Sequence, residues 1–319
     1  MRPGWVIFAT FACCAALGAM LIALDPPRAP EAPTAVIAPS ATDGDREASP
    51  PRAPPGPSAP AVPRPPSPTP PSGPCAADMV LVEAFHCPFV AHVCKKRMPG
   101  PRGACVAFEP RVLCEGTLRK KRFCVDRFEY PNLEGALPAV LVDWNEAKRA
   151  CAAEDKRLCT VDEWQLACEG EAILPYTTGV LRAKGDCNWD ARAETPVIPT
   201  RGLGVATELA RLDGRVPSGS LARCVSPFGV HDMGGNVAEW VDDPTGSLKR
   251  APFASVVAGG AFGASEGTCR AVDADGAPSQ RASTVGFRCC ADPEGLPVPG
   301  DKRKAKGGFQ PLATAPGLP

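Results

Sequence analysis

The chain has 319 residues, of which 44% are hydrophobic, and its 35 lysine and arginine residues balance its 35 aspartate and glutamate residues. A balanced composition produces no long-range field of one sign, which argues against a nucleic-acid-binding protein and against electrostatic capture of an acidic substrate. The length admits two domains, but only residues 75–292 have the composition of a folded core.

Residues 1–25 contain an apolar segment. Trp5 to Leu24 carries no charge, follows Arg2, and is about as long as a helix that crosses a bilayer. A cleavable signal usually has a shorter apolar region that ends in a small-x-small site, whereas this segment runs directly into Asp25. We predict an uncleaved membrane anchor, with a signal segment as the alternative.

Residues 26–74 are rich in proline and alanine and contain no aromatic residue. Such a stretch cannot bury enough apolar surface to fold, so we predict a disordered linker. It would span about 40 Å as a flexible coil and about 150 Å as polyproline II, although it could instead serve as a proline-rich ligand. Residues 293–319, rich in Pro, Gly and Lys, are also predicted to be disordered.

Two short basic runs interrupt the balanced charge, at Arg119–Arg122 and at Lys302–Lys306. Runs of this length are usually solvated loops or tails, so they do not predict a phosphate-binding or nucleic-acid-binding surface. No nucleic acid is expected as a partner.

Cysteine usage indicates the compartment. Sixteen cysteines are present, and fourteen of them follow the apolar segment. Disulfides at this density persist in an oxidising environment, so we predict a periplasmic or extracellular domain. The connectivity is open. Cys187 with Cys224 is one expected pair, and others are expected among Cys75, Cys87, Cys94, Cys105 and Cys114. A zinc site built from Cys87, His92 and Cys94 is the alternative for that cluster.

Local patterns predict a mixture of strands and helices. Met79–Phe85 and Arg122–Tyr130 alternate as strands do. Capping boxes begin two helices, one after Asp143 and one after Thr160, because each cap is followed three residues later by glutamate. The first helix should bury Trp144, Ala147 and Cys151, and the second should place Trp164, Ala167 and Cys168 on one face. Residues 185–252 are predicted to be loop-rich. The fold class is α+β.

Several separated blocks then identify a family. In chain order they are MVLVEAF, FCVDRFEYPN, VDWNEAKRACAAEDKRLCTVDEWQLACEG, CNWD, SPFGVHDMGGNVAEW, AGGAF and GFRCC. The ordered set resembles the formylglycine-generating enzyme (sulfatase-modifying factor) family and covers Met79 to Asp292. The resemblance implies that family's fold, which is similar to C-type lectins and has little regular secondary structure, here in a disulfide-rich form.

The family's chemistry oxidises a cysteine of a sulfatase to formylglycine with O2 and a Cu(I) ion held by two thiolates. Soft thiolates select Cu(I), so both are required. The resemblance places Ala264 where the first catalytic cysteine would stand and Cys269 where the second would. We therefore predict a divergent member that acts in binding or structure, with Cys269 bridged to Cys289 or Cys290. The alternative is an active copper- and O2-dependent oxidase that works through Cys269.

The resemblance also implies calcium. Gly235, Asn236, Val237 and Glu239 match the family's calcium-binding turn, and Asn188 and Trp189 match a second site. Backbone carbonyls and a carboxylate suit calcium, which prefers six to eight oxygen ligands. A turn capped by its own Asn and Glu is the alternative. In both cases the role is structural.

Other cofactors are not expected. A related branch of the family binds iron through three histidines, but His86, His92 and His231 lack the spacing of that array. The expected partners are a protein, peptide or glycan of the cell envelope, and the membrane through the N-terminal segment.

Overall fold

The computed structural model describes residues 73–100, 103–191, 197, 203–248, 254–264, 267–294, 302–304 and 308–311. The predicted anchor and nearly all of the predicted linker lie outside these residues. None of the described helices is long and apolar enough to span a bilayer.

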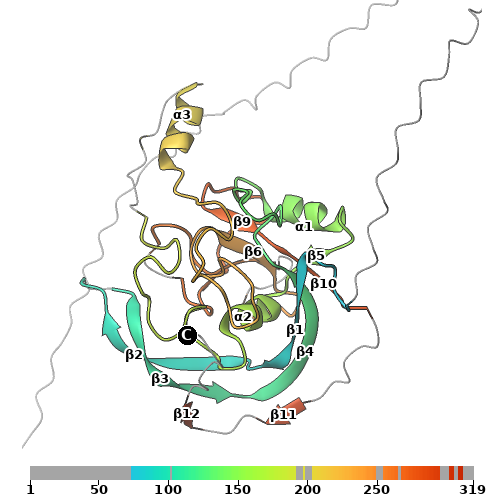
Figure 1. Cartoon of the computed structure of the whole chain (residues 1–319), viewed down its shortest axis with the longest axis vertical. Helices are drawn as coiled ribbons and strands as arrows, with labels where there is room; N and C mark the ends of the chain where they lie inside the picture. Colours follow the sequence, from blue (N-terminus) through green and yellow to red (C-terminus); the bar gives the residue numbers. More distant parts are fainter. Residues whose placement is uncertain are drawn as a thin grey trace, which may run out of the picture. The chain divides into compact units, whose positions relative to one another are not determined.

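The first sheet has the strand order β1, β4, β10, β5, with β11 also paired to β4 (Figure 1). All of β1 pairs antiparallel with β4, from Met79 opposite Asp126 to His86 opposite Arg119. Val82 and Phe123 face the core from these two strands and are fully buried. The strands are β1 (Met79–His86), β4 (Thr117–Asp126), β5 (Arg157–Leu158), β10 (Cys289–Ala291) and β11 (Lys302–Lys304).

Two smaller sheets complete the described strands. One has the order β12, β3, β2, and the other has the order β8, β7, β6, β9. They are built from β2 (Phe89–Arg97), β3 (Cys105–Glu115), β6 (Ala238–Asp242), β7 (Ser255–Ala258), β8 (Val272–Asp273), β9 (Val285–Phe287) and β12 (Phe309–Pro311).

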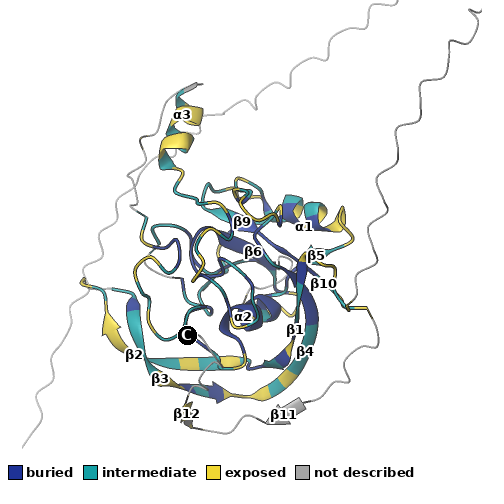
Figure 2. Ribbon diagram, in the orientation of Figure 1, coloured by how far each residue is buried: buried dark blue, intermediate teal, exposed yellow. Residues whose placement is uncertain are grey.

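The helices are α1 (Trp144–Ala152), α2 (Val161–Glu169) and α3 (Leu203–Leu212). Both predicted capping boxes are confirmed, with Asp143 and Glu146 at α1 and Thr160 and Glu163 at α2. Helix α2 lies in the main core, where Trp164, Leu166 and Cys168 pack against residues of the first and third sheets. Figure 2 shows α2 mostly as buried ribbon within the curve of β1 and β4.

Four local expectations differ from the structure. The second predicted strand ends at Asp126, because the Asn132 side chain accepts the Phe128 amide and donates to the Asp126 carboxylate, which bends the chain. Trp144 is only partly buried; its indole nitrogen donates to the Val241 carbonyl, and the Lys148 ammonium lies over its ring.

Helix α3 lies within the region predicted to be loops, and its sequence lacks the capping box that revealed α1 and α2. The tail predicted to be disordered contributes β11, which pairs with β4, and β12, which pairs with β3.

The fourteen cysteines that follow the linker form seven disulfides within the described residues. Because disulfides persist where the environment is oxidising, this pattern indicates a compartment outside the reducing cytosol. The bridges join Cys75 to Cys124, Cys87 to Cys114, Cys94 to Cys105, Cys151 to Cys289, Cys159 to Cys290, Cys168 to Cys269 and Cys187 to Cys224.

These pairs confirm the expected Cys187–Cys224 bridge and two of those expected in the N-terminal cluster. Cys75 pairs outside that cluster, with Cys124, and the bridged Cys87 and Cys94 offer no thiolate for zinc. The expected bridge from Cys269 to Cys289 or Cys290 is wrong. Neighbouring strand residues point to opposite faces, so Cys289 and Cys290 reach the two different segments at Cys151 and Cys159.

Candidate functional site

The segment that aligns with the family's catalytic cysteines is closed by a disulfide. The sulfur of Cys269 is bonded to that of Cys168 on α2, with the two Cα atoms 5.4 Å apart, and both residues are fully buried. The Cys269 amide also donates to the Pro175 carbonyl at 2.9 Å. Cys269 therefore has no free thiolate, and Ala264 has no sulfur. The residues present do not fit a copper ion held by two thiolates.

The Ala264 end of this segment is held by an arginine. The guanidinium of Arg182 donates to the Ala264 carbonyl at 3.0 Å and to the Trp189 carbonyl at 2.6 Å. It also forms an ion pair with Asp190 at 2.6 Å, and its side chain is only 6% exposed. The buried guanidinium of Arg182 therefore holds the loop that contains Ala264 against Trp189.

The cysteine-rich hairpin of β2 and β3 contacts residues 175–182, which in turn bond to Ala264 and Cys269. The Phe108 amide donates to the Val180 carbonyl and the Arg182 amide donates to the Val106 carbonyl, each at 2.9 Å. The hydroxyl of buried Tyr176 donates to the Cys105 carbonyl. Two disulfides cross-link the hairpin, so it holds residues 175–182 in place.

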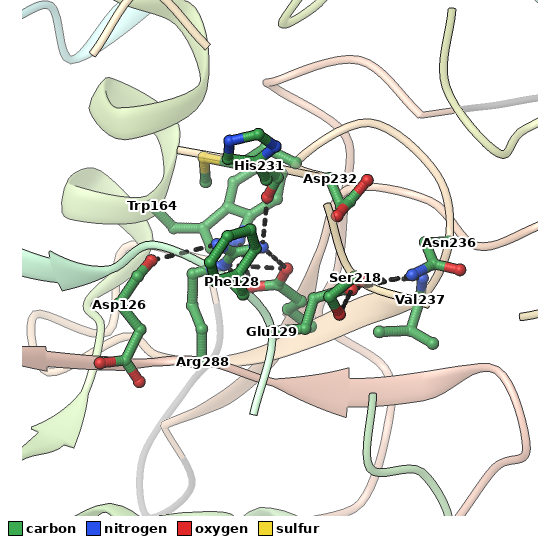
Figure 3. A network of polar contacts seen from close by, with 12 residues as sticks. Asp126, Phe128, Glu129, Trp164, Ser218, His231, Asp232, Asn236, Val237 and Arg288 are labelled. Atoms are coloured by element: carbon green, nitrogen blue, oxygen red, sulfur yellow. Dashed lines mark hydrogen bonds and ion pairs between the residues drawn. The ribbon is translucent and has the colours of Figure 1, made fainter. Parts of the chain in front are cut away.

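A second polar centre lies under the GGNVAEW turn, and Figure 3 shows its polar contacts, some on Arg288 and others joining Ser218 and Asn236 to Glu129. Arg288 is fully buried and donates to the Glu239 carboxylate at 2.7 to 3.0 Å. It also donates to the carbonyls of Asp126 and His231, while the Trp164 indole donates to Glu239 at 2.8 Å. Glu239 therefore interacts with a guanidinium and an indole N–H.

The asparagines of the two predicted calcium sites contact each other. The Asn188 side-chain amide donates to the Asn236 Oδ1 at 3.0 Å, and the Val216 amide donates to the same oxygen at 2.9 Å. The Asn236 backbone amide donates to the Asn188 carbonyl. The structure thus joins these residues through hydrogen bonds that already use both lone pairs of the Asn236 Oδ1.

Two carboxylates that were not predicted as site residues lie next to this turn. Glu129 is fully buried and accepts from the Ser218 hydroxyl at 2.7 Å and from the Asn236 side-chain amide at 2.8 Å. Asp232 is 1% exposed and accepts from the Gly219 amide at 2.6 Å through Oδ2. Its Oδ1 is buried and has no hydrogen-bond partner.

Burial and like charge make these carboxylates hard to ionise. Burial raises the pKa of Glu129 well above its usual value, and the neighbouring Asp232 and Glu239 raise it further. Burial also raises the pKa of Asp232 to about 6, although the Gly219 amide lowers it. Arg288 is paired with Glu239, so a cation bound beside Glu129 and Asp232 would favour their ionised forms, which burial otherwise disfavours.

The fit of a calcium ion depends on which oxygens of this centre already accept hydrogen bonds. Glu239 does not fit, because its oxygens accept from Arg288 and Trp164, and the Trp189 carbonyl accepts from Arg182. The unpartnered, buried oxygen of Asp232, with Glu129 near enough to interact electrostatically, does fit a hard cation. No group of three or more His, Cys, Asp or Glu side chains suited to a metal occurs among the described residues, so such an ion would need carbonyl ligands.

Sequence reasoning missed Glu129, Asp232, Arg182 and Arg288. For Glu129 and Asp232, the available signal was an acidic residue beside aromatic or apolar residues, as in RFEYPN and GVHDMGG. A charged residue in such a place is expected to be buried with a partner. That signal identifies a buried polar centre but does not identify the partners.

Comparison with known proteins agrees with the family suggested by the ordered sequence blocks. A family model described as the sulfatase-modifying factor enzyme 1-like domain matches residues 116–293. The formylglycine-generating enzyme of Bos taurus is 29% identical over 174 residues, which cover 49% of this chain and 44% of the relative. That of Mus musculus is 28% identical over 179 residues, with the same coverage.

The chain thus spans less than half the length of these curated relatives. Among solved structures, PvdO from Pseudomonas aeruginosa is 18% identical with a TM-score of 0.41, over 67% of this chain and 94% of that one. The family match covers more than half of the chain and includes α1, α2, the GGNVAEW turn and the Cys289–Cys290 pair. This chain belongs to the family of sulfatase-modifying factor enzyme 1-like domains.

Proposed function

We propose that this protein is a divergent member of its family that lacks copper-dependent cysteine oxidation and acts as an extracytoplasmic binding domain. The observation that carries the proposal is the Cys168–Cys269 disulfide, together with Ala264 at the other catalytic position. The oxidation needs two thiolates on one Cu(I) ion, and this segment supplies none. The alternative of an oxidase that works through Cys269 requires that disulfide to open.

The surrounding contacts favour the same conclusion. Cys269 and Cys168 are both 0% exposed, so neither a reductant nor a substrate peptide reaches the sulfur atoms in this arrangement. The hairpin of β2 and β3 also holds the neighbouring residues 175–182 in place. A loop-rich domain stapled by seven disulfides instead presents fixed surfaces that suit a protein, peptide or glycan ligand.

The proposed absence of oxidase activity can be tested on the full chain. The protein is incubated with Cu(I), O2 and a cysteine-containing peptide, and aldehyde is measured by mass spectrometry. We expect no aldehyde from the wild type. The variant A264C/C168A rebuilds the pair of thiols, and we expect it to bind Cu(I) at least about 100-fold more tightly than C168A, which has one thiol.

Chelator competition measures that affinity and does not depend on turnover. Aldehyde formation by the wild type would overturn the proposal. Cu(I) binding by the wild type as tight as by A264C/C168A would also contradict it, because a bridged Cys269 offers no thiolate.

We further propose that a calcium ion binds at Asp232 and Glu129 beside the Gly235–Val237 turn and favours their ionised forms. Calcium would supply charge and fix the turn, without redox chemistry. The support is the unpartnered, buried Oδ1 of Asp232 and the proximity of a second carboxylate.

Calcium at a hundred times its dissociation constant should stabilise the wild type by about 2.7 kcal/mol, seen as a higher Tm than in EDTA. The D232N variant should lose most of that shift. D190N is the matched control, because Asp190 lies beside the second predicted site and pairs with Arg182. An unchanged shift in D232N, or a shift lost only in D190N, would place the ion elsewhere.

The location proposed for this domain is outside the cytoplasm, joined to a membrane by residues 1–25 through the linker at 26–74. The support is the apolar uncharged segment in the sequence and the seven disulfides of the folded domain.

A further inference from the structure

The Cys168–Cys269 bridge is flanked by a buried ion pair. Glu169 follows Cys168 at the end of α2, and Arg270 follows Cys269 in the chain. The Arg270 guanidinium donates to both carboxylate oxygens of Glu169, with its Nε 2.6 Å from Oε2. The Glu169 side chain is 0% exposed and the Arg270 side chain is 15% exposed. The two segments that the bridge joins covalently are thus also joined by the charges of the adjacent residues.

Arg270 holds its segment against two further groups. Its Nη1 donates to the Gln165 side-chain oxygen on α2 at 3.0 Å, and its Nη2 donates to the Cys87 carbonyl at 2.9 Å. A planar guanidinium that makes several hydrogen bonds in one arrangement fixes position more closely than a single contact does. Arg270 therefore provides docking contacts for the Cys269 segment that do not require the covalent bridge.

The charge of Glu169 depends on this contact. Burial raises the pKa of Glu169 to about 7, although Arg270 lowers it. A bridge between Cys269 and any other cysteine would draw Arg270 away and leave this carboxyl group buried without its countercharge. Leaving one member of a buried ion pair alone is strongly destabilising. The pair therefore discriminates against wrong partners of Cys269 as well as favouring the right one.

A second bridge within the described residues has the same arrangement. Asp186 precedes Cys187, Arg223 precedes Cys224, and the Arg223 Nε lies 2.6 Å from an Asp186 carboxylate oxygen. The Arg223 side chain is 72% exposed, so solvent weakens this pair relative to the buried one. Two of the seven bridges thus have paired charges next to their cysteines.

We propose that the Glu169–Arg270 pair directs Cys269 to Cys168 during oxidative folding, so that the ion pair forms first and selects the bridge. Attraction between the two side chains raises the effective concentration of one thiol at the other. This role concerns how the domain forms, so it is independent of the copper and calcium sites considered above.

The oxidant in this step is a small disulfide, such as oxidised glutathione. The thiolate of one cysteine attacks the oxidant, which forms a mixed disulfide and releases one reduced glutathione. The thiolate of the other cysteine then attacks the protein sulfur of the mixed disulfide and releases a second. Two electrons pass from the cysteine pair to the oxidant, and the two thiol protons end on the released glutathione. The ion pair assists the second attack, because it brings the second cysteine to the first.

The test refolds the reduced, urea-denatured full chain in detergent and a glutathione buffer at about pH 8, where thiolates form. Samples are alkylated, and the share of Cys168 bridged to Cys269 is measured by peptide mass spectrometry without reduction. At the time when half of the wild type has this bridge, E169Q should have at least about fivefold less of it.

The matched control is E163Q, which makes the same change in another glutamate of α2. Glu163 is 9% exposed in its side chain and accepts from the Arg157 guanidinium at 2.7 and 2.8 Å, but neither of its neighbours in the chain is a cysteine. E163Q should leave the share of the bridge within about twofold of the wild type. Equal losses in the two variants would overturn the proposal, because a general weakening of α2 would then explain both.

The double variant E169Q/R270Q separates pairing from stability. It leaves no unpaired charge, so its stability in urea, once the bridges have formed, should recover at least about half of the loss in E169Q. Its early share of the bridge should remain as low as in E169Q, because the attraction is absent. Recovery of the early share together with the stability would contradict the proposal.

Salt provides a measurement on the unmodified chain. Raising the salt concentration from about 0.1 M to about 1 M shortens the screening length from about 10 Å to about 3 Å. The Cys168–Cys269 bridge should then form at least about twofold more slowly relative to the Cys159–Cys290 bridge, whose cysteines have only uncharged neighbours in the chain. An unchanged ratio of the two rates would show that attraction between charges does not select the bridge.

Discussion

Replacing Arg288 with methionine is expected to lower the free energy of unfolding by about 3 to 5 kcal/mol, measured by urea denaturation. Arg288 is fully buried, and its guanidinium forms the ion pair with Glu239 and hydrogen bonds to the Asp126 and His231 carbonyls. Methionine fills a similar volume but leaves the Glu239 carboxylate without its countercharge. Glu129 and Asp232 already raise the electrostatic cost of negative charge at this point.

The double variant R288M/E239Q is the control, because it removes both charges of the pair. A neutral amide can still accept the Trp164 indole N–H, so the double variant should recover at least about half of the stability lost by R288M. A loss below about 1 kcal/mol in R288M would show that the buried pair does not hold the turn. Equal losses in the single and double variants would show that packing, and not the unpaired carboxylate, is responsible.

Removing the Cys168–Cys269 disulfide in the variant C168A/C269A is expected to destabilise the domain by about 2 to 5 kcal/mol in denaturant under non-reducing conditions. The two cysteines are 101 residues apart, and closing a loop of about 100 residues is worth up to about 4.7 kcal/mol through the entropy of the unfolded chain. The other six bridges already restrict that chain, so the lower half of the range is expected.

The matched control is C94A/C105A, whose cysteines are 11 residues apart in the β2–β3 hairpin. Its loop is shorter and its location is partly exposed, so its loss should be smaller by about 1 kcal/mol or more. A loss in C94A/C105A that exceeds the loss in C168A/C269A would contradict the structural role given to the Cys269 bridge.

The sequence predicted the parts of this domain that depend on local rules. Both capping boxes begin helices where expected, since an Asp or Thr cap followed by glutamate satisfies amides within one turn. The first strand also lies where its alternation predicts. The ordered blocks identified the family because they are spread over the whole domain, whereas a single helix or strand pattern occurs in many folds.

Long-range pairing could not be predicted in the same way. Nothing local distinguishes Cys168 from Cys289 as the partner of Cys269, because the choice depends on how α2 packs against the loop. Likewise, the turn suggested Glu239 as a calcium ligand, whereas the fold brings Arg288 to that carboxylate from 49 residues away. Strand β11 was missed because its pairing depends on β4 and not on its own apolar content.

The two adjacent cysteines of β10 have a consequence for biosynthesis. Their bridges reach back 138 and 131 residues, to Cys151 and Cys159, and the Cys269 bridge reaches back 101. A chain that enters an oxidising compartment N-terminus first exposes Cys151, Cys159 and Cys168 well before their partners arrive. Premature oxidation would join these early thiols to one another. Correct maturation therefore requires that they remain reduced, or are reshuffled by an isomerase, until the final strand has been delivered.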